Sequence, residues 1–511
     1  MISAEQEGRR GSALVLAIIT ALVLTVLVGA LFLLFQSNMA AYEWHKEELQ
    51  CMYSAESGAR LATYMILEGS DLPQTDTEQF LPESGPTWFS LPGEDLGETL
   101  VYVDPHRQNA EITASNAYVV RALGRIVVEE EAYTFGMENM LMPENFSRFS
   151  CFQNLGFASG YYDDGYRFDG PFHSNGPINI WSGSVGSLND PYFYSLSIAR
   201  RTGGDGYYYG QSQGGGTLTD QPAIGALTIQ PIDRMLMGPP FFDMHADSIP
   251  YGSSEVNWEP VENAAKNGGL YFGPEAPGPS ELPDGARLMI ANDKLLVKRN
   301  STAAVEEYIL SDLANPVVWI DNGPNERVYL RQLAPDSIPS TGLEGAYTIG
   351  MMGDLYLSGA LKYQDTDIVN PNNDDMLGII TVKGDIIMAY DPDAWGGPDW
   401  PEPWEIMMDA KFQYYAVLMS LDGVIEAEWY PSHSPYPASG DHTMELTGGY
   451  IAQTEGVTSS SGGGGFAIDI YYDTRLMSQN PPFFPSTGKW HEVFWKERPD
   501  LEEDDMGEDY Y

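Results

Sequence analysis

The chain begins with one long apolar stretch, which runs from Ala13 to Phe35 without a charged residue. About 20 apolar residues are enough for a helix to cross a bilayer, so this stretch predicts a membrane-spanning helix. Leu22 and Val26 then lie near the middle of the bilayer. A small residue such as Gly29 lets a neighbouring helix approach closely, which makes this position a candidate for helix packing.

The charges around the stretch predict its orientation. Arg9 and Arg10 precede it, whereas Glu43 opens its far side. Positively charged flanks stay in the cytoplasm, so we expect a single-pass inner-membrane protein with most of the chain outside. A cleavable signal peptide is the alternative, but its apolar region is normally about 7–15 residues long and ends at a small-residue site. Residues 36–41 offer only a weak site, so the sequence favours a retained anchor.

The helical pattern continues beyond the apolar stretch. Apolar residues recur near helical spacing as far as Ile66, and the first proline is Pro73. The sequence therefore predicts one helix over residues 12–68, roughly 80 Å long. Its first half is suited to lipid and its second half to water.

The rest of the chain has the pattern of a β protein. Short apolar runs are separated by turn signals rich in Gly, Pro, Asn and Asp. The predicted strands of the larger part are 178–181, 317–320, 327–330, 346–349, 354–357, 377–382, 385–390, 414–419, 424–429, 444–447 and 466–471. Several, such as 377–382, are apolar on both faces, which is typical of buried parallel strands.

These patterns predict a long N-terminal transmembrane helix followed by a mainly β ectodomain. A parallel β-helix is favoured for the ectodomain, and a β-sandwich is the alternative because the strands show no fixed period. The expected segments are a cytoplasmic leader at 1–11, the helix at 12–68, a linker at 69–97, a small strand-rich head at 98–146, a large β-rich ectodomain at 147–498 and a disordered acidic tail at 499–511.

Two short motifs resemble those of a known family. Arg10-Gly11-Ser12-Ala13 stands at the start of the apolar run. Ala55-Glu56-Ser57-Gly58 follows the end of that run, in the second half of the predicted helix. Together with the long helix, these motifs resemble the N-terminus of PilX-type minor pilins and pseudopilins. Major pilins place Phe after the glycine and Glu five residues into the mature chain, whereas this chain has Ser12 and Leu16.

The resemblance implies a function and partners. Gly11 and Ser12 would flank the prepilin peptidase cleavage site, and Ala55, Glu56 and Gly58 would form an assembly motif. The expected partners are other pilin or pseudopilin subunits, the pilus assembly machinery and the inner membrane. The ectodomain would be periplasmic, or extracellular once assembled in a filament.

The larger part of the chain also resembles a family. Segments 170–178, 376–381, 419–423, 472–476 and 481–485 look like markers of an uncharacterised bacterial ectodomain that is often fused to PilX-type N-termini. Because the activity of that family is unknown, this resemblance implies only architecture and a pilus context.

The charge of the chain excludes one class of partner, and its cysteines suggest one possible cross-link. The chain carries 73 acidic and 26 basic residues, for a net charge of −47. Such a surface repels polyanions, so we expect no binding of nucleic acid. The two cysteines, Cys51 and Cys151, are candidates for a disulfide in an oxidising compartment, and two buried thiols are the alternative.

No catalytic motif stands out in the sequence, and we predict that the protein is not an enzyme. His173 lies beside Ser174 and Asn175, where it is expected to anchor a turn; a role as general base is the alternative. We expect no cofactor, except that oxygen-rich loops offer possible calcium ligands. These candidate ligands are Asn372, Asp374, Asp375, Asp391 and Asp393, and solvated acidic turns are the alternative.

Three functions are consistent with these patterns. The favoured one is a structural and interaction subunit of a type IV pilus-like or pseudopilus assembly. A membrane-anchored β-helix enzyme acting on polysaccharide is the second, and it would need two carboxylates about 5–10 Å apart in a groove. The third is an adhesin that binds a surface glycan through exposed aromatics such as Trp395 and Trp400.

Overall fold

The computed structural model of this chain describes most of the predicted elements. It describes residues 3–67, 79–81, 87–90, 97–106, 117–128, 131–155, 167–176, 178–180, 192–199, 209–211, 242–274, 280–323, 326–332, 342–370, 373–388, 411–427, 443–456, 467–477 and 479–501. Most of the predicted linker, the candidate calcium ligands Asn372, Asp391 and Asp393, the tryptophans Trp395 and Trp400, and the acidic tail beyond residue 501 lie outside these residues.

The chain divides into two compact units. The small unit comprises Met1–Arg107, Ala117–Leu141 and Glu492–Tyr511, and the large unit comprises Gln108–Asn116 and Met142–His491. The C-terminal residues therefore belong with the N-terminal ones, because the chain leaves the small unit along one strand and returns to it along another.

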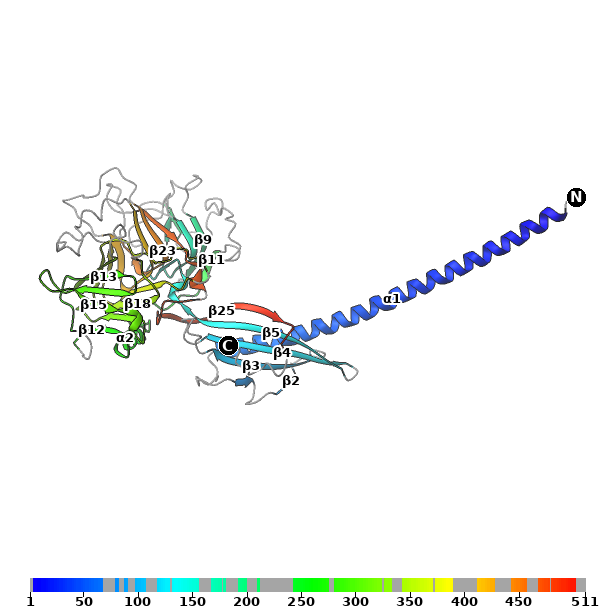
Figure 1. The fold of residues 1–511 in the computed structure, drawn as a ribbon, viewed down its shortest axis with the longest axis horizontal. Helices are drawn as coiled ribbons and strands as arrows, with labels where there is room; N and C mark the ends of the chain where they lie inside the picture. Colours follow the sequence, from blue (N-terminus) through cyan, green and yellow to red (C-terminus); the bar gives the residue numbers. More distant parts are fainter. Residues whose placement is uncertain are drawn as a thin grey trace. The chain divides into compact units, whose positions relative to one another are not determined.

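The small unit is a long helix and an antiparallel sheet. Helix α1 spans Ser3–Leu67, and Figure 1 shows its second half running beside β3 and β4. The sheet has the order β1-β3-β4-β5-β25, with β2 also paired to β3. Its strands are β1 Gln79–Leu81, β2 Phe89–Ser90, β3 Glu98–His106, β4 Ala117–Val128, β5 Glu131–Asn145 and β25 Ser486–Arg498.

The two halves of α1 have different surroundings. From Val15 to Phe35, the large apolar side chains are all between 50% and 67% exposed, on every side of the helix. The span from Val15 to Ile66 is long and apolar enough to cross a membrane. From Cys51 onward, one face of the helix is buried against the sheet.

The large unit is a stack of parallel β coils. Its strands are β6 Cys151–Gln153, β7 Arg167–Ser174, β8 Ile178–Ile180, β9 Tyr192–Ala199, β10 Tyr209–Gln211, β11 Phe242–Ala246, β12 Leu270–Phe272, β13 Ala286–Ala291, β14 Lys294–Lys298, β15 Glu306–Ile309, β16 Val317–Ile320, β17 Arg327–Gln332, β18 Ala346–Met351, β19 Asp354–Leu357, β20 Met376–Thr381, β21 Ile386–Met388, β22 Lys411–Ala427, β23 Thr443–Glu455 and β24 Ala467–Tyr471. Its helical segments are α2 Glu259–Lys266 and the 3₁₀ turns Phe146–Arg148, Leu310–Asp312 and Thr474–Met477.

Successive coils pair in register. Val317 lies beside Thr348, Thr348 beside Gly378, Gly378 beside Val417, and Val417 beside Gly449, all in parallel ladders. A second ladder runs through β13, β17, β19 and β21. Strand β22 pairs with both β20 and β21, so one sheet continues around the stack.

The stack does not follow the order of the chain throughout. Strands β6 and β24 both pair with β23 and with β7, and β9 and β11 follow β7. The N-terminal strands of the large unit therefore stack on its C-terminal ones. Antiparallel pairing among the described strands of this unit is confined to β13, β14 and β15.

Both faces of the central strands are buried. In β16, Val318 and Ile320 belong to one apolar cluster, whereas Val317 and Trp319 belong to a second cluster that includes α2. These alternating side chains explain why the strands read as apolar on both faces.

The structure confirms the predicted fold class of one long apolar helix followed by a mainly β ectodomain. The parallel ladders have the pairing pattern of a β-helix, while a β-sandwich would bring antiparallel strands together. One local prediction was wrong. The sequence predicts strands at 414–419 and 424–429 with a turn at Leu421-Asp422-Gly423 between them. The structure instead has one strand, β22, which continues from Lys411 to Ala427 with a shift of register between Ser420 and Val424.

Candidate functional site

The second half of α1 carries the residues of the Ala55-Glu56-Ser57-Gly58 motif, and its packing explains most of them. The buried residues of this helix recur every three or four positions: Cys51, Ser54, Ala55, Gly58, Ala59, Ala62, Thr63 and Ile66. This spacing places them on one face. That face contacts β3 and β4 of the same chain.

Two glycines allow the helix and the sheet to approach closely. A Cβ added at Gly58 would lie 2.9 Å from Val101 Cγ2 and closer still to Thr99 Oγ1. A Cβ added at Gly124, on β4, would collide with the Cys51 carbonyl oxygen and lie 2.6 Å from the Ala55 amide nitrogen. Ala55 and Gly58 therefore act inside the small unit, where they let its helix lie against its sheet.

Glu56 lies beside the packed face of α1 and is partly exposed. Its carboxylate forms an ion pair with Arg60, at 2.7 Å from Nη2, and the side chains of Glu56 and Arg60 are 29% and 70% exposed. The Arg60 guanidinium in turn lies 5.7 Å from the ring centre of Trp495, close enough for a cation–π contact. Glu56 thus has a partner one helical turn away within its own chain.

Polar contacts inside the small unit fix the helix and the last strand on the sheet. The Asn139 amide donates to Thr63 Oγ1 at 3.0 Å, and both residues are buried. Glu138 on β5 accepts from Arg121 and from Arg498, each at 3.2 Å. These contacts join α1, β4, β5 and β25 through buried and half-buried groups, whose loss costs more than that of exposed ones.

From Val15 to Phe35, the part of the first half of α1 whose side chains the structure describes, the large apolar side chains are exposed. Gly11 and Ser12 lie within its helical backbone. Nothing comes within 4 Å of a Cβ added at Gly29, and Leu22 and Val26 are 63% and 64% exposed. This half therefore leaves apolar side chains uncovered all around the helix.

The two cysteines lie in different units, and neither forms a disulfide in the structure. Both are buried. The Cys51 thiol donates to the Tyr133 carbonyl at 3.3 Å, on the sheet that α1 covers. Cys151 begins β6 and belongs to the apolar cluster of the large unit.

His173 has both ring nitrogens in hydrogen bonds. Nδ1 lies 2.8 Å from Ser197 Oγ, and Nε2 lies 3.0 Å from Asn175 Oδ1. The ring is 3% exposed and stacks on Phe152. Asn175 also bonds the backbone of Ile249 in both directions. His173 therefore lies in strand β7 and not in a turn, and its ring links β7 to β9 and, through Asn175, to Ile249.

A half-buried serine meets an exposed lysine and an exposed aspartate at another point that the sequence did not single out. Ser253 Oγ donates to Asp422 Oδ2 at 2.6 Å, Lys383 Nζ lies 2.7 Å from that same oxygen, and Lys383 also donates to Ser253. Burial raises the pKa of Asp422, but the hydrogen bonds from Lys383 and Ser253 bring it below its ordinary value. The lysine is the charge partner of the aspartate here. The cluster therefore fastens the segment around Ser253 to Lys383, between β20 and β21, and to Asp422 on β22, and it supplies no base that could activate the serine.

The described part of the predicted calcium loop uses its oxygens internally. The Asp375 carboxylate accepts the N–H of Gly345 at 2.7 Å and the N–H of Asp365 at 2.9 Å. Asn373 Oδ1 accepts the N–H of Asp375 at 2.9 Å, and Asp374 is exposed. Within the residues that the structure describes, no three His, Cys, Asp or Glu side chains are grouped so that they can hold a metal ion.

Three carboxylates lie near one another on successive coils. Asp354 Oδ1 accepts the N–H of Asp385 at 2.9 Å, and Asp385 Oδ1 accepts the N–H of Val424 at 2.8 Å. Burial raises the pKa of Asp354, and the charge of Asp385 adds to the increase. Burial also raises the pKa of Glu426, with Asp385 and Asp354 contributing. Two of these carboxylates therefore serve as links between coils.

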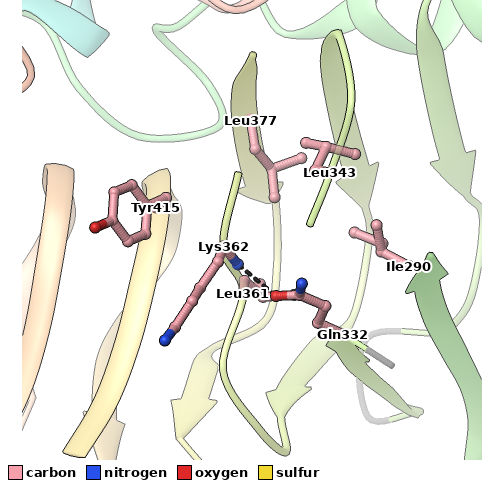
Figure 2. Close-up of a pocket in the computed structure, with 7 residues that line it drawn as sticks. All are labelled: Ile290, Gln332, Leu343, Leu361, Lys362, Leu377 and Tyr415. Atoms are coloured by element: carbon pink, nitrogen blue, oxygen red, sulfur yellow. Dashed lines mark hydrogen bonds between the residues drawn. The ribbon is translucent and has the colours of Figure 1, made fainter. Parts of the chain in front are cut away.

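A recess between coils of the large unit is lined mainly by apolar residues, among them Leu343, Leu361 and Leu377 (Figure 2). It is too narrow to hold a water molecule. The backbone N–H of Lys362 donates to Gln332 Oε1 at 2.6 Å, and the lysine side chain extends away from that glutamine. The recess is a packing seam with one satisfied polar contact.

Comparisons with known proteins add a structural similarity. No protein-family model and no curated protein matches this chain. Among solved structures, the chain is similar to the competence-associated pilin ComZ from Thermus thermophilus, at 10% identity and a TM-score of 0.30, over 88% of this chain and 97% of that one. With so little identity and so low a score, the function has to be inferred from the residues of this chain.

Proposed function

We propose that this protein is a structural subunit of a type IV pilus-like or pseudopilus assembly. The observation that carries the proposal is the contrast along α1. Its second half is covered by the sheet of its own chain, whereas Val15–Phe35 exposes apolar side chains all around. An apolar surface of this size needs a cover. Lipid supplies it before assembly, and the helices of other subunits supply it in the filament.

The orientation and the processing belong to the same proposal. Arg9 and Arg10 hold the N-terminus in the cytoplasm, and the large unit faces outward. Cleavage between Gly11 and Ser12 gives a mature chain that begins with the apolar helix. Sequencing the N-terminus of the membrane-extracted protein tests this step, and an intact Met1 or a new end near Ala40 contradicts it.

The decisive experiment asks where the full chain goes. Cells are fractionated and surface filaments are sheared off, and the protein is then followed in both fractions. We expect it in the inner membrane and in the sheared filaments. If it is absent from the filaments while other filament subunits are present, the proposal is wrong.

We propose further that the large unit presents a binding surface and is not an enzyme. His173 is buried with both nitrogens bonded, and Lys383 is paired with Asp422, so neither supports nucleophilic catalysis. A surface glycan remains the candidate ligand. Cleavage of a polysaccharide by the purified full chain, lost on His173→Ala with the fold intact, would promote the alternative of a membrane-anchored β-helix enzyme.

A further inference from the structure

An N-glycosylation motif lies at an exposed loop of the large unit. Asn300-Ser301-Thr302 has the pattern Asn-x-Ser/Thr of glycan acceptor sites. It stands in the loop between the antiparallel strands β14 and β15. All three residues are exposed, so an enzyme can reach them without unfolding the chain.

The asparagine side chain is held by one of its two polar atoms. Asn300 Oδ1 accepts the N–H of Thr302 at 3.0 Å, the hydroxyl of Thr302 at 3.0 Å and the N–H of Ala303 at 2.8 Å. Nδ2 makes no hydrogen bond to any described residue. Three donors on the oxygen polarise the amide and make its N–H a better acid, which favours the proton loss that bond formation at the nitrogen requires.

The base of the loop is fixed. Arg299 donates to Glu306 through Nε at 2.6 Å and through Nη2 at 3.3 Å. Its Nη1 donates to the carbonyls of Ser280 and Glu281 at 2.9 and 2.8 Å. Bidentate contacts of this kind fix direction as well as distance, so the loop holds the asparagine at the surface.

A second copy of the same motif, Asn145-Phe146-Ser147, provides an internal contrast. Asn145 is buried, and its Nδ2 donates to the Phe484 carbonyl at 2.7 Å. Ser147 is fully buried and donates to Asn480 at 2.8 Å. Here the same tripeptide is used for packing, with its amide nitrogen already bonded. Of these two copies, the one at Asn300 is exposed, and its amide nitrogen makes no hydrogen bond to a described residue.

We propose that Asn300 is the acceptor of an N-linked glycan. In the transfer, Asn300 Nδ2 forms a bond to the anomeric carbon of a sugar carried on a polyprenyl pyrophosphate. The bond between that carbon and the pyrophosphate oxygen breaks, the pyrophosphate leaves with its carrier, and the amide proton passes to a base of the transferase. The inference rests on the outward orientation in the proposed function, since such transfer takes place outside the cytoplasm.

The test compares intact masses of the full chain, purified in detergent from the cells that naturally make it. We expect a mass above that of the polypeptide, with the excess on the peptide that contains Asn300 and none on the peptide that contains Asn145. Asn300→Gln and Thr302→Ala should both remove the excess. Thr302→Ser and the matched surface variant Ser301→Ala should keep it, because the acceptor pattern survives.

Protease access to the large unit in intact spheroplasts, measured in parallel, separates two kinds of failure. If the large unit is digested from outside and Asn300 is unmodified, the glycan proposal is wrong and the orientation stands. If the large unit is protected inside the cytoplasm, both proposals are wrong. A mass excess that persists in Asn300→Gln also overturns the assignment.

Discussion

The small and the large unit bury their apolar side chains in different ways. In the small unit one face of a helix covers one face of a sheet, and charged groups of neighbouring strands, such as Arg121 on β4 and Glu138 on β5, pair with each other. In the large unit the central strands are buried on both faces, in two separate apolar clusters, one of which includes α2. Carboxylates between its coils, such as Asp354 and Glu426, lie beside other carboxylates.

This difference explains why α1 has two characters. A cover made of one helix ends where the sheet ends, so any further apolar turns of that helix must find another partner. A stack of coils carries its own cover along its length. The exposed run Val15–Phe35 is therefore a requirement for lipid or for other chains, whereas the large unit can bury its core by itself.

The largest expected effect comes from a charge in the exposed half of α1. Leu22→Asp places a carboxylate near the middle of the bilayer, at a cost of about 2.5–3.5 kcal/mol. Membrane retention and filament incorporation should fall together in fractionation and shearing assays. The matched control is Leu61→Asp in the packed half, where Leu61 is already 42% exposed. Equal retention of both variants would contradict a membrane role for the first half.

Adding a side chain at a glycine tests the packed half. Gly58→Val forces a branched side chain against Thr99 and Val101, and overpacking of this kind costs about 1–3 kcal/mol. Thermal unfolding of the full chain in detergent, together with faster hydrogen exchange in β3 and β4, should report the loss. Gly29→Val is the control, since its Cβ meets nothing. A stable Gly58→Val variant would mean that the helix does not lie tightly on the sheet.

Acidification should raise the stability of the large unit, whose carboxylates lie beside other carboxylates. The raised pKa values of Asp354 and Glu426 mean that the folded large unit binds protons more tightly than the unfolded chain does. Its stability should then rise as the pH falls from 7 through the raised values toward the unfolded ones, near 4. Denaturant unfolding followed in the large unit at several pH values measures this. A double variant, Asp354→Asn with Glu426→Gln, should flatten the dependence, and an unchanged slope would refute the assignment.

Much of the architecture could be predicted because its signals are local. The helix predicted over 12–68 is observed at Ser3–Leu67, and the strand predicted at 354–357 is β19. Side chains that are apolar on both faces correctly pointed to parallel stacking. The stacking of β6 on β23 could not be predicted, since it depends on contacts between segments about 300 residues apart in the sequence.

Other strands were missed because charged residues interrupt the apolar pattern by which a strand is recognised in a sequence. The hairpin of β13 and β14 contains the buried charges Arg287 and Lys298, which interrupt the apolar alternation that marks a strand. Its two-residue turn places Asn292 at a φ of 55°, a backbone that asparagine tolerates, so Asn292-Asp293 was a usable signal. At the candidate site, the motif around Ala55 could be found from sequence. Its contact with Gly124 could not, because only the fold brings β4 under the helix.

The smallest effect concerns Glu56, which borders the packed face of α1. An exposed pair of residues four apart on a helix contributes about 0.3–0.5 kcal/mol, and Glu56 pairs in this way with Arg60. Glu56→Gln should therefore lower the stability of the full chain only slightly and leave filament incorporation unchanged. Arg60→Gln removes the same pair from the other side, together with the contact to Trp495, so it should lower the stability at least as much and also leave incorporation unchanged. If Glu56→Gln alone abolished incorporation at unchanged stability, the carboxylate would be contacting another subunit. Glu56 would then act in assembly, like the exposed half of α1, and not only in the packing of its own chain.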